Sequence, residues 1–130
     1  MKKTMVSTLV FLSLSAGSFA ADLTNDPRIT RELTAAAVGD EIRNHCDRIS
    51  ANMFVALTKA LSLKQHAKRL GASEDEIDQF LRSKAEQNRI RGLRDSYLKK
   101  NGVVVGKPET YCALGEREMA QRTLIGSIIN

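Results

Sequence analysis

The sequence predicts an all-α protein, a small bundle of about five helices that follows a leader segment and is clamped by one disulfide. Apolar residues recur at three- and four-residue steps through most of the chain, which is the spacing of a helix face. Proline occurs only at Pro27 and Pro108, so long helices can run between these positions. No stretch longer than Val103 to Val105 is expected to form a strand.

The first twenty residues have the layout of a secretory signal peptide. Two lysines near the start precede an apolar run from Met5 to Leu14, and small residues precede a cut after Ala20. That run is too short to cross a bilayer as a permanent helix, although a short membrane anchor is the alternative. The first cysteine is Cys46, so an N-terminal lipid anchor is not expected. We therefore expect a signal peptide at 1–20, one exported domain at 21–130, and a periplasmic location in a Gram-negative cell.

The charge balance excludes some classes of partner. The chain has twenty Lys and Arg and fifteen Asp and Glu, and two of the lysines lie in the leader, which leaves a net charge of +3. A mixed surface with a small net charge is typical of a solvated exported protein, so no nucleic-acid partner is expected. No later segment reaches spanning length, so no permanent membrane span is expected, while peripheral membrane contact stays open.

The first helix is expected to open at Asp26 and Pro27, an N-cap acceptor followed by proline at the first helical position. Ile29 and Leu33 share one side of this helix, whereas the apolar residues within 38–46 share another. The drift predicts that the helix contacts different neighbours along its length.

The second helix, from Ile49 to Ala67, has the clearest pattern. Six of its apolar residues recur at helical steps and are expected to gather on one face: Ile49, Met53, Phe54, Leu57, Ala60 and Leu61. Leu70 and Gly71 close the helix, because glycine can adopt the left-handed cap conformation.

A short third helix and a fourth helix follow. Ser73 can accept a hydrogen bond from the amide of Glu76 while the Glu76 side chain reaches back, which is a capping box. The residues expected to face inward from the third helix are Ile77, Phe80 and Leu81. Ser83 repeats the capping pattern, so a fourth helix runs to Asn101, either as a separate helix or as a bent continuation. Bases lie all around the fourth helix, which indicates a solvated surface and not one basic stripe.

The last helix is expected from Tyr111 to about Ile128, capped by Thr110. It is apolar on more than one side, so one face can dock inward while the other is offered to a partner. The offered residues under this hypothesis are Leu114, Leu124, Ile125 and Ile128. The alternative is a central helix that is buried on both sides, and the sequence leaves the two open.

Two cysteines in an exported bacterial protein of this size are most simply a disulfide, because that compartment is oxidising. Cys46 ends the first helix and Cys112 begins the last, so a bridge would join the two terminal helices. The chain-entropy relation gives a loop of this length about 4 kcal/mol of stabilisation.

Metal and catalytic sites find little support in the sequence. His45 and Cys46 are neighbours on a helix and point about 100° apart, so they do not converge on one ion as an i, i+4 pair does. His66 would have to join them from the exposed side of the second helix. The chain has no C-x-x-C, G-x-S-x-G, H-E-x-x-H or glycine-rich phosphate loop. We expect no metal, no cofactor and no catalytic residue.

Three segments carry a resemblance to a family of small exported proteins of unknown function from alphaproteobacteria. They are "DEIRNHCDRISANMFVALTKA", "EIDQFLRSKAEQNRIRGLRDSYL" and "YCALGEREMAQRTLIG", and the similarity covers nearly all of the chain after the leader. The resemblance implies a helical layout with paired cysteines. It implies no activity, cofactor or functional residue.

Together these features favour a periplasmic, non-enzymatic accessory or protein-binding module. A partner protein is expected rather than a small molecule. The alternatives are a chaperone-like stress protein that exposes apolar surface conditionally and, third, a small periplasmic enzyme.

Overall fold

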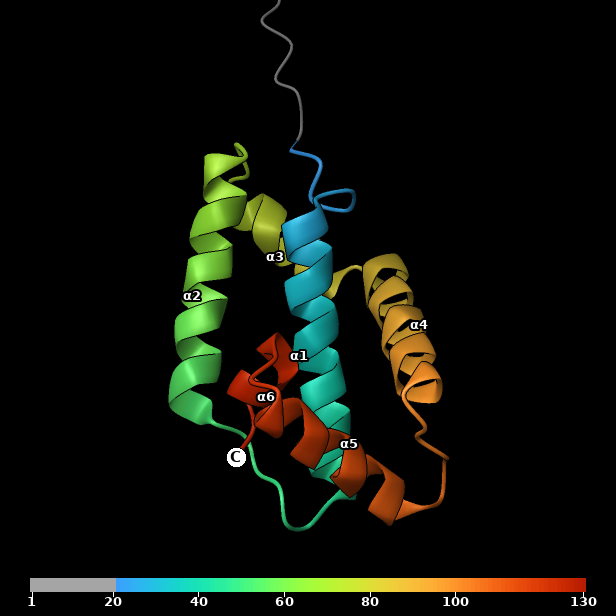
Figure 1. Cartoon of the computed structure of the whole chain (residues 1–130). Coiled ribbons are helices and arrows are strands. Elements are labelled where there is room, and N and C mark those ends of the chain that lie inside the picture. The colour runs from blue at the N-terminus through green and yellow to red at the C-terminus, as the bar shows by residue number, and fades with distance from the viewer. Residues whose placement is uncertain (1–20) are drawn as a thin grey trace, which may run out of the picture.

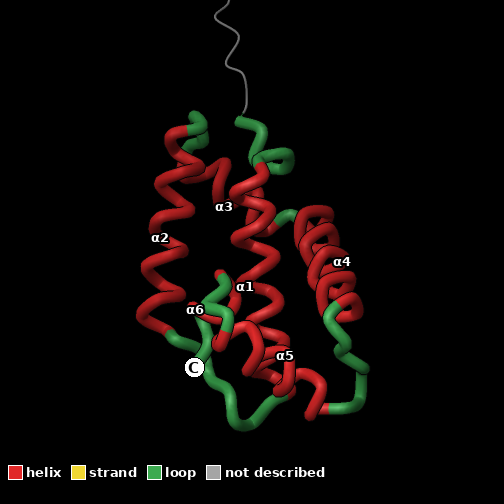
Figure 2. The backbone as a smooth tube through the Cα atoms, in the orientation of Figure 1, coloured by secondary structure: helices red, strands yellow, loops and turns green. Residues whose placement is uncertain are grey.

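The computed structural model describes residues 21–130, and these residues form six helices (Figures 1 and 2). The helices are α1 (Pro27–His45), α2 (Met53–Arg69), α3 (Glu74–Arg82), α4 (Lys84–Lys100), α5 (Pro108–Ala120) and α6 (Leu124–Ser127). Within this range no strand occurs, and the one isolated β-bridge joins Ala51 to Ile129. The all-α prediction is confirmed. The predicted signal peptide, residues 1–20, lies outside the described residues.

Helix α1 is the centre of the bundle, with α2 and α4 on opposite sides of it in Figure 1. Its most extensive packing is against α4, followed by α5 and α6, and its contact with α2 is smaller. Helix α5 crosses the C-terminal end of α1, and α3 lies near the opposite end (Figure 1). Helix α2 therefore stands at the edge of the bundle with few neighbours.

The predicted starts of α1, α3 and α4 are confirmed by their hydrogen bonds. The side chain of Asp26 accepts from the N–H of Ile29 at 2.8 Å. Ser73 and Glu76 form both bonds of the capping box. Ser83 has an extended backbone and caps α4, so α3 and α4 are separate helices. Each of these bonds joins residues three apart, which is why the local sequence predicts them.

The apolar side chains form two separate cores. The larger core lies between the C-terminal half of α1, the end of α4, α5 and the C-terminus, and its fully buried members are Val38, Ile42, Cys46 and Leu114. The smaller core lies at the other end of the molecule and consists of Leu23, Ile29, Ala67, Ala72 and Ile77. Helix α1 contributes one part of its surface to each core, which confirms the predicted drift of its apolar residues.

The predicted disulfide between Cys46 and Cys112 is present, with the two Cα atoms 5.2 Å apart. It joins the C-cap of α1 to the second turn of α5, and both cysteines are buried in the larger core. A structural disulfide is typical of proteins in an oxidising, exported environment.

The C-terminal region differs from the prediction of one helix from Tyr111 to about Ile128. Helix α5 starts three residues earlier, at Pro108, and ends at Ala120, and its N-cap is Lys107, without a side-chain hydrogen bond, and not the predicted Thr110. The chain then turns through Arg122, whose φ of 53° lies in the left-handed region, and restarts as α6. Gly126 lies so close to α5 that a Cβ atom there would be 2.1 Å from the Glu118 carbonyl oxygen. The break therefore depends on a close backbone contact that only glycine permits.

Candidate functional site

The most unusual feature of the structure is the surface of α2. Four large side chains of the predicted apolar face lie in solvent, with exposed fractions of 70% for Met53, 81% for Phe54, 60% for Leu57 and 55% for Leu61. Within α2 only Ala67 is buried. Ile49, which was predicted to start this helix, lies in the preceding loop and is buried in the larger core. Periodicity placed the side chains on one face correctly, but no other helix covers that face.

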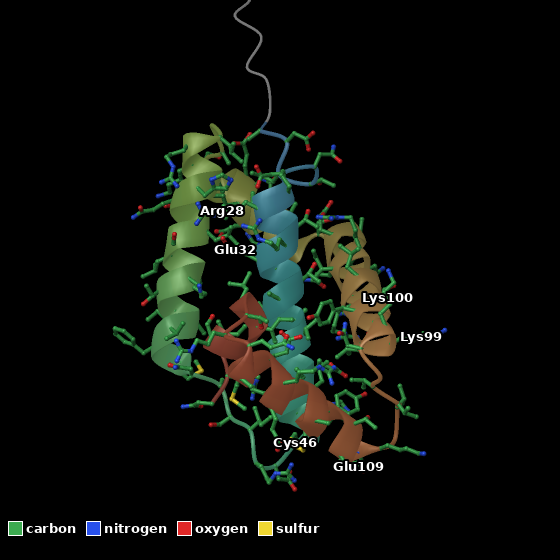
Figure 3. The ribbon with its side chains drawn as sticks, viewed as in Figure 1. Arg28, Glu32, Cys46, Lys99, Lys100 and Glu109 are labelled. Atoms are coloured by element: carbon green, nitrogen blue, oxygen red, sulfur yellow. A yellow bond between two sulfur atoms is a disulfide. The ribbon has the colours of Figure 1, made fainter. Side chains whose placement is uncertain are left out.

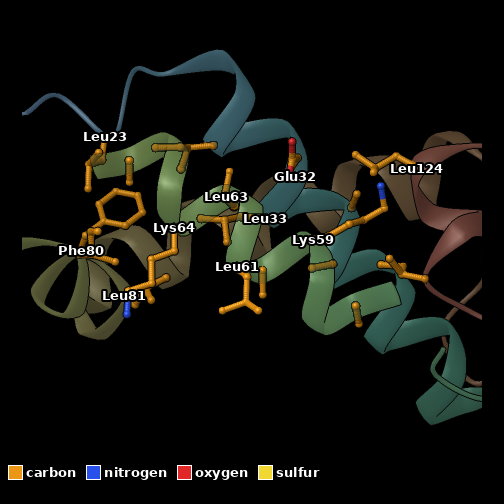
Figure 4. A pocket seen from close by; sticks show the side chains of 18 of the residues that line it. Leu23, Glu32, Leu33, Lys59, Leu61, Leu63, Lys64, Phe80, Leu81 and Leu124 are labelled. Atoms are coloured by element: carbon orange, nitrogen blue, oxygen red, sulfur yellow. The ribbon is translucent and has the colours of Figure 1, made fainter. Parts of the chain in front are cut away.

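An apolar groove of about 350 Å³ runs beside this face, between α1, α2 and α3 (Figure 4). Its floor is made of small residues on the two facing helices: Ala35 and Ala36 from α1, and Ala56, Ala60 and Ala67 from α2. Leucines and Phe80 form the walls. Leu81 was predicted to face inward, yet it is half exposed at the edge of the groove. The alanines leave the space open, because their side chains are too short to fill the gap between α1 and α2.

Helix α2 is held chiefly at its two ends. At its start, the backbone N–H of Asn52 donates to the carbonyl of Ile128 at 2.8 Å, and Ser50 and Asn130 exchange two backbone hydrogen bonds. At its end, Ala67 is buried in the smaller core. Between these anchors the groove separates α2 from α1, and a hydrogen bond from the Arg28 side chain of α1 to the Ser62 hydroxyl of α2, at 3.1 Å, joins the two helices.

The side chain of His66 also anchors α2 to α1, and its position differs from the prediction. It was expected on the exposed side of the second helix, but its Nε2 atom lies 3.1 Å from Oδ1 of Asp26 and the side chain is largely covered. The pKa of Asp26 is lowered, chiefly by the hydrogen bond from the N–H of Ile29 and less by His66. One carboxylate therefore caps α1 and also ties α2 to it.

Charged side chains frame the groove. Arg28 pairs with Glu32 at 2.7 Å on α1, and Lys64 of α2 pairs with Glu74 of α3 at 2.6 Å. The hydrogen bond with Lys64 lowers the pKa of Glu74 and raises that of the lysine. Lys59 also lines the groove and is half buried, but it forms no ion pair with any residue of 21–130.

The four residues predicted to offer a partner contact do not form an open surface. Leu114, Ile125 and Ile128 are 0%, 6% and 9% exposed and belong to the larger core, and Leu124 is half buried against it. The hypothesis of an exposed C-terminal face is wrong, and the alternative of a helical segment buried on both sides describes the structure. Leu124 and Ile128 nevertheless reach one end of the groove.

A second hollow, of about 420 Å³, lies between α1, α4 and the α5–α6 turn. Buried Glu118 accepts hydrogen bonds there from the hydroxyls of Tyr97 and Thr123. Burial, followed by the hydrogen bond to Glu118, raises the pKa of Tyr97 to about 12. Because both carboxylate oxygens are occupied, this cluster joins α4 to the α5–α6 turn.

His45 and Cys46 have separate partners in the structure. Cys46 is bonded to Cys112, and the ring of His45 stacks on Tyr111 with centroids 4.4 Å apart. The surroundings of His45 are thus those of a packed aromatic ring at a helix end. Residues 21–130 hold no group of three or more His, Cys, Asp or Glu side chains that could bind a metal ion. Figure 3 shows Cys46 at the end of α1, far along the helix from the Arg28 and Glu32 pair that borders the groove.

The groove itself was not predicted from the sequence. A usable signal was present, because the apolar arc of α2 includes three alanines as well as large side chains and is wider than one packed face requires. A second signal was the matching alanine run on α1.

Comparison with known proteins identifies a family but no characterised relative. Among residues 21–130, no helix has both the length and the apolar character needed to cross a membrane. No curated protein and no solved structure matches the chain. The profile of a family of unknown function (DUF5333) matches residues 21–130, and the chain therefore belongs to that family.

Proposed function

We propose that this chain is a periplasmic, non-enzymatic accessory protein that binds a partner protein through the exposed face of α2. The observation that carries the proposal is the set of large apolar side chains on that face, above all Met53, Phe54 and Leu57, which lie in solvent although the helix is anchored at both ends. Exposed apolar surface of this kind marks interaction sites in folded proteins. Aromatic residues and methionine are also enriched in protein interfaces.

The α2 face replaces the C-terminal patch as the proposed contact surface. Helix α2 carries Lys59, Lys64, Lys68 and Arg69 and no acidic residue, so it keeps a net positive charge although Glu74 of α3 pairs with Lys64 and Lys68. Two copies of this face would bring like charges together, which disfavours self-association through α2. A different partner with acidic side chains around its apolar contact fits better.

The periplasmic location rests on the predicted leader together with the disulfide. Export with cleavage after Ala20 predicts that the intact mass of the exported protein starts at Ala21. A leader retained in the exported fraction would contradict this part of the proposal. The predicted alphaproteobacterial origin is part of the same proposal.

A crosslinking pull-down from a periplasmic extract tests the function. The wild-type protein should retain one stoichiometric partner, and the double variant Phe54→Ser, Leu57→Ser should lose it while keeping its helicity. Val105→Ser is the matched control, because Val105 is an exposed apolar residue in a loop away from α2. Retention of many proteins in substoichiometric amounts would indicate the chaperone-like alternative. Equal retention by the double variant and the wild type would refute the α2 face as the contact.

A further inference from the structure

The groove has the size and composition of a site for a small apolar ligand, separate from the outward face of α2. Ligand pockets of folded proteins measure about 300–1,000 Å³ and have mostly apolar walls, and this groove measures about 350 Å³. A helix is about 10–12 Å across with its side chains, so the groove is too small to seat one whole. A flexible hydrocarbon chain can follow it. Met53, Phe54 and Leu57 do not line the groove, so a ligand there would not need the proposed partner face.

The charges at the groove favour an anionic head group at one end. Figure 4 shows Lys59 and Leu124 toward one end, and Leu23, Phe80 and Leu81 toward the other. Among the bases near the groove, Arg28 and Lys64 already have carboxylate partners, whereas Lys59 has none within residues 21–130.

The acidic side chains of the groove support the same orientation. The charge of Glu32 is compensated by Arg28 at 2.7 Å. Asp78 lines the groove on α3, and its charge disfavours an anion at that end. A carboxylate is therefore favoured at the end of the groove where Lys59 lies.

We propose that the groove binds a free fatty acid, with the carboxylate paired to Lys59 and the acyl chain running between α1 and α2 toward Leu23 and Phe80. The small residues Ala36 and Ala60 leave room for the chain, and the leucines and Phe80 that line the groove supply an apolar surface for it. This site does not depend on the proposed protein partner.

Binding of dodecanoate to the oxidised protein, measured by calorimetry below the micellar concentration, tests the proposal. Lys59→Gln should weaken binding about tenfold, the effect expected for one charge-assisted hydrogen bond. Lys107→Gln, which removes an exposed lysine away from the groove, should leave the affinity unchanged. Dodecanol should bind more weakly than dodecanoate and equally to wild type and Lys59→Gln. Ala60→Phe, at an exposed α2 position on the groove, should abolish binding without lowering the melting temperature.

Several results would overturn the proposal. The first two are the absence of dodecanoate binding and an equal dodecanoate affinity in Lys59→Gln and wild type. The other two are dodecylammonium binding as tight as that of dodecanoate, and binding to anionic phospholipid vesicles but not to the free acid. Phe54→Ser should leave dodecanoate affinity unchanged, since Phe54 does not line the groove. If Phe54→Ser no longer retains the protein partner but binds dodecanoate with full affinity, the fatty-acid site is separate from the proposed partner-binding surface.

Discussion

Opening the Cys46–Cys112 bond should be the most destabilising single change that leaves the apolar packing nearly intact. The bond joins residues that are 66 apart in the chain, and the chain-entropy relation assigns a loop of that length about 4 kcal/mol. Small domains have about 5–15 kcal/mol of total stability. Either Cys46→Ser or Cys112→Ser should therefore lower the free energy of unfolding by a large fraction of its value.

Denaturation by urea, followed by the helical circular dichroism signal, measures this loss. Because the two single variants open the same loop, the double variant should lose about as much as either one, and reduction of the wild type should reach a similar midpoint. Additive losses in the double variant would refute the loop argument. An unchanged midpoint after complete reduction would also refute it, because the bond would then contribute nothing to stability.

Three further predictions use the same measurement. Ser73→Ala should lower the free energy of unfolding by about 0.5–2 kcal/mol through loss of the α3 cap, and an unchanged midpoint would contradict the observed capping box. Leu57→Ser should change stability by less than about 0.5 kcal/mol because its side chain is exposed, whereas Ile125→Asp should cost several kcal/mol in the core; similar losses would refute the assigned burial. The pKa of Tyr97 is about 12 in the folded state and 10.0 in the unfolded state. The protonated hydroxyl should therefore contribute to the free energy of unfolding below pH 10, and this contribution should be lost as the pH rises toward 12. Tyr97→Phe should remove that part of the alkaline loss, and an unchanged alkaline profile would contradict the raised pKa.

The features that the sequence predicted correctly are those decided by nearby residues or by compartment chemistry. The caps at Asp26 and Ser73 involve partners three residues away, so their hydrogen bonds can be read from the chain. The disulfide followed from two cysteines behind a leader, because an oxidising compartment favours their pairing. The drift of apolar residues along α1 predicted different neighbours at its two ends, and two separate cores are present.

The features that could not be predicted depend on contacts between distant segments. The break after Ala120 requires Gly126 to lie against the Glu118 carbonyl, and the helical repeat of apolar residues does not predict that contact. The exposure of Phe54 and Leu57 has a related cause. A helical period shows which side chains share a face, whereas burial depends on whether another element packs there.

The open groove is explained by the two cores at its ends. An apolar helix face beside a bundle is driven to collapse onto its neighbour, and closing the space between α1 and α2 would bury Leu61, which lines the groove and is exposed. The start of α2 is fixed by backbone hydrogen bonds to the C-terminal residues, and its end is fixed in the smaller core and by the contact of His66 with Asp26. Since both anchors would have to move for the space to close, collapse would disrupt packing that is already satisfied. The same anchors that hold α2 away from α1 thus maintain an apolar surface that a ligand or partner can cover.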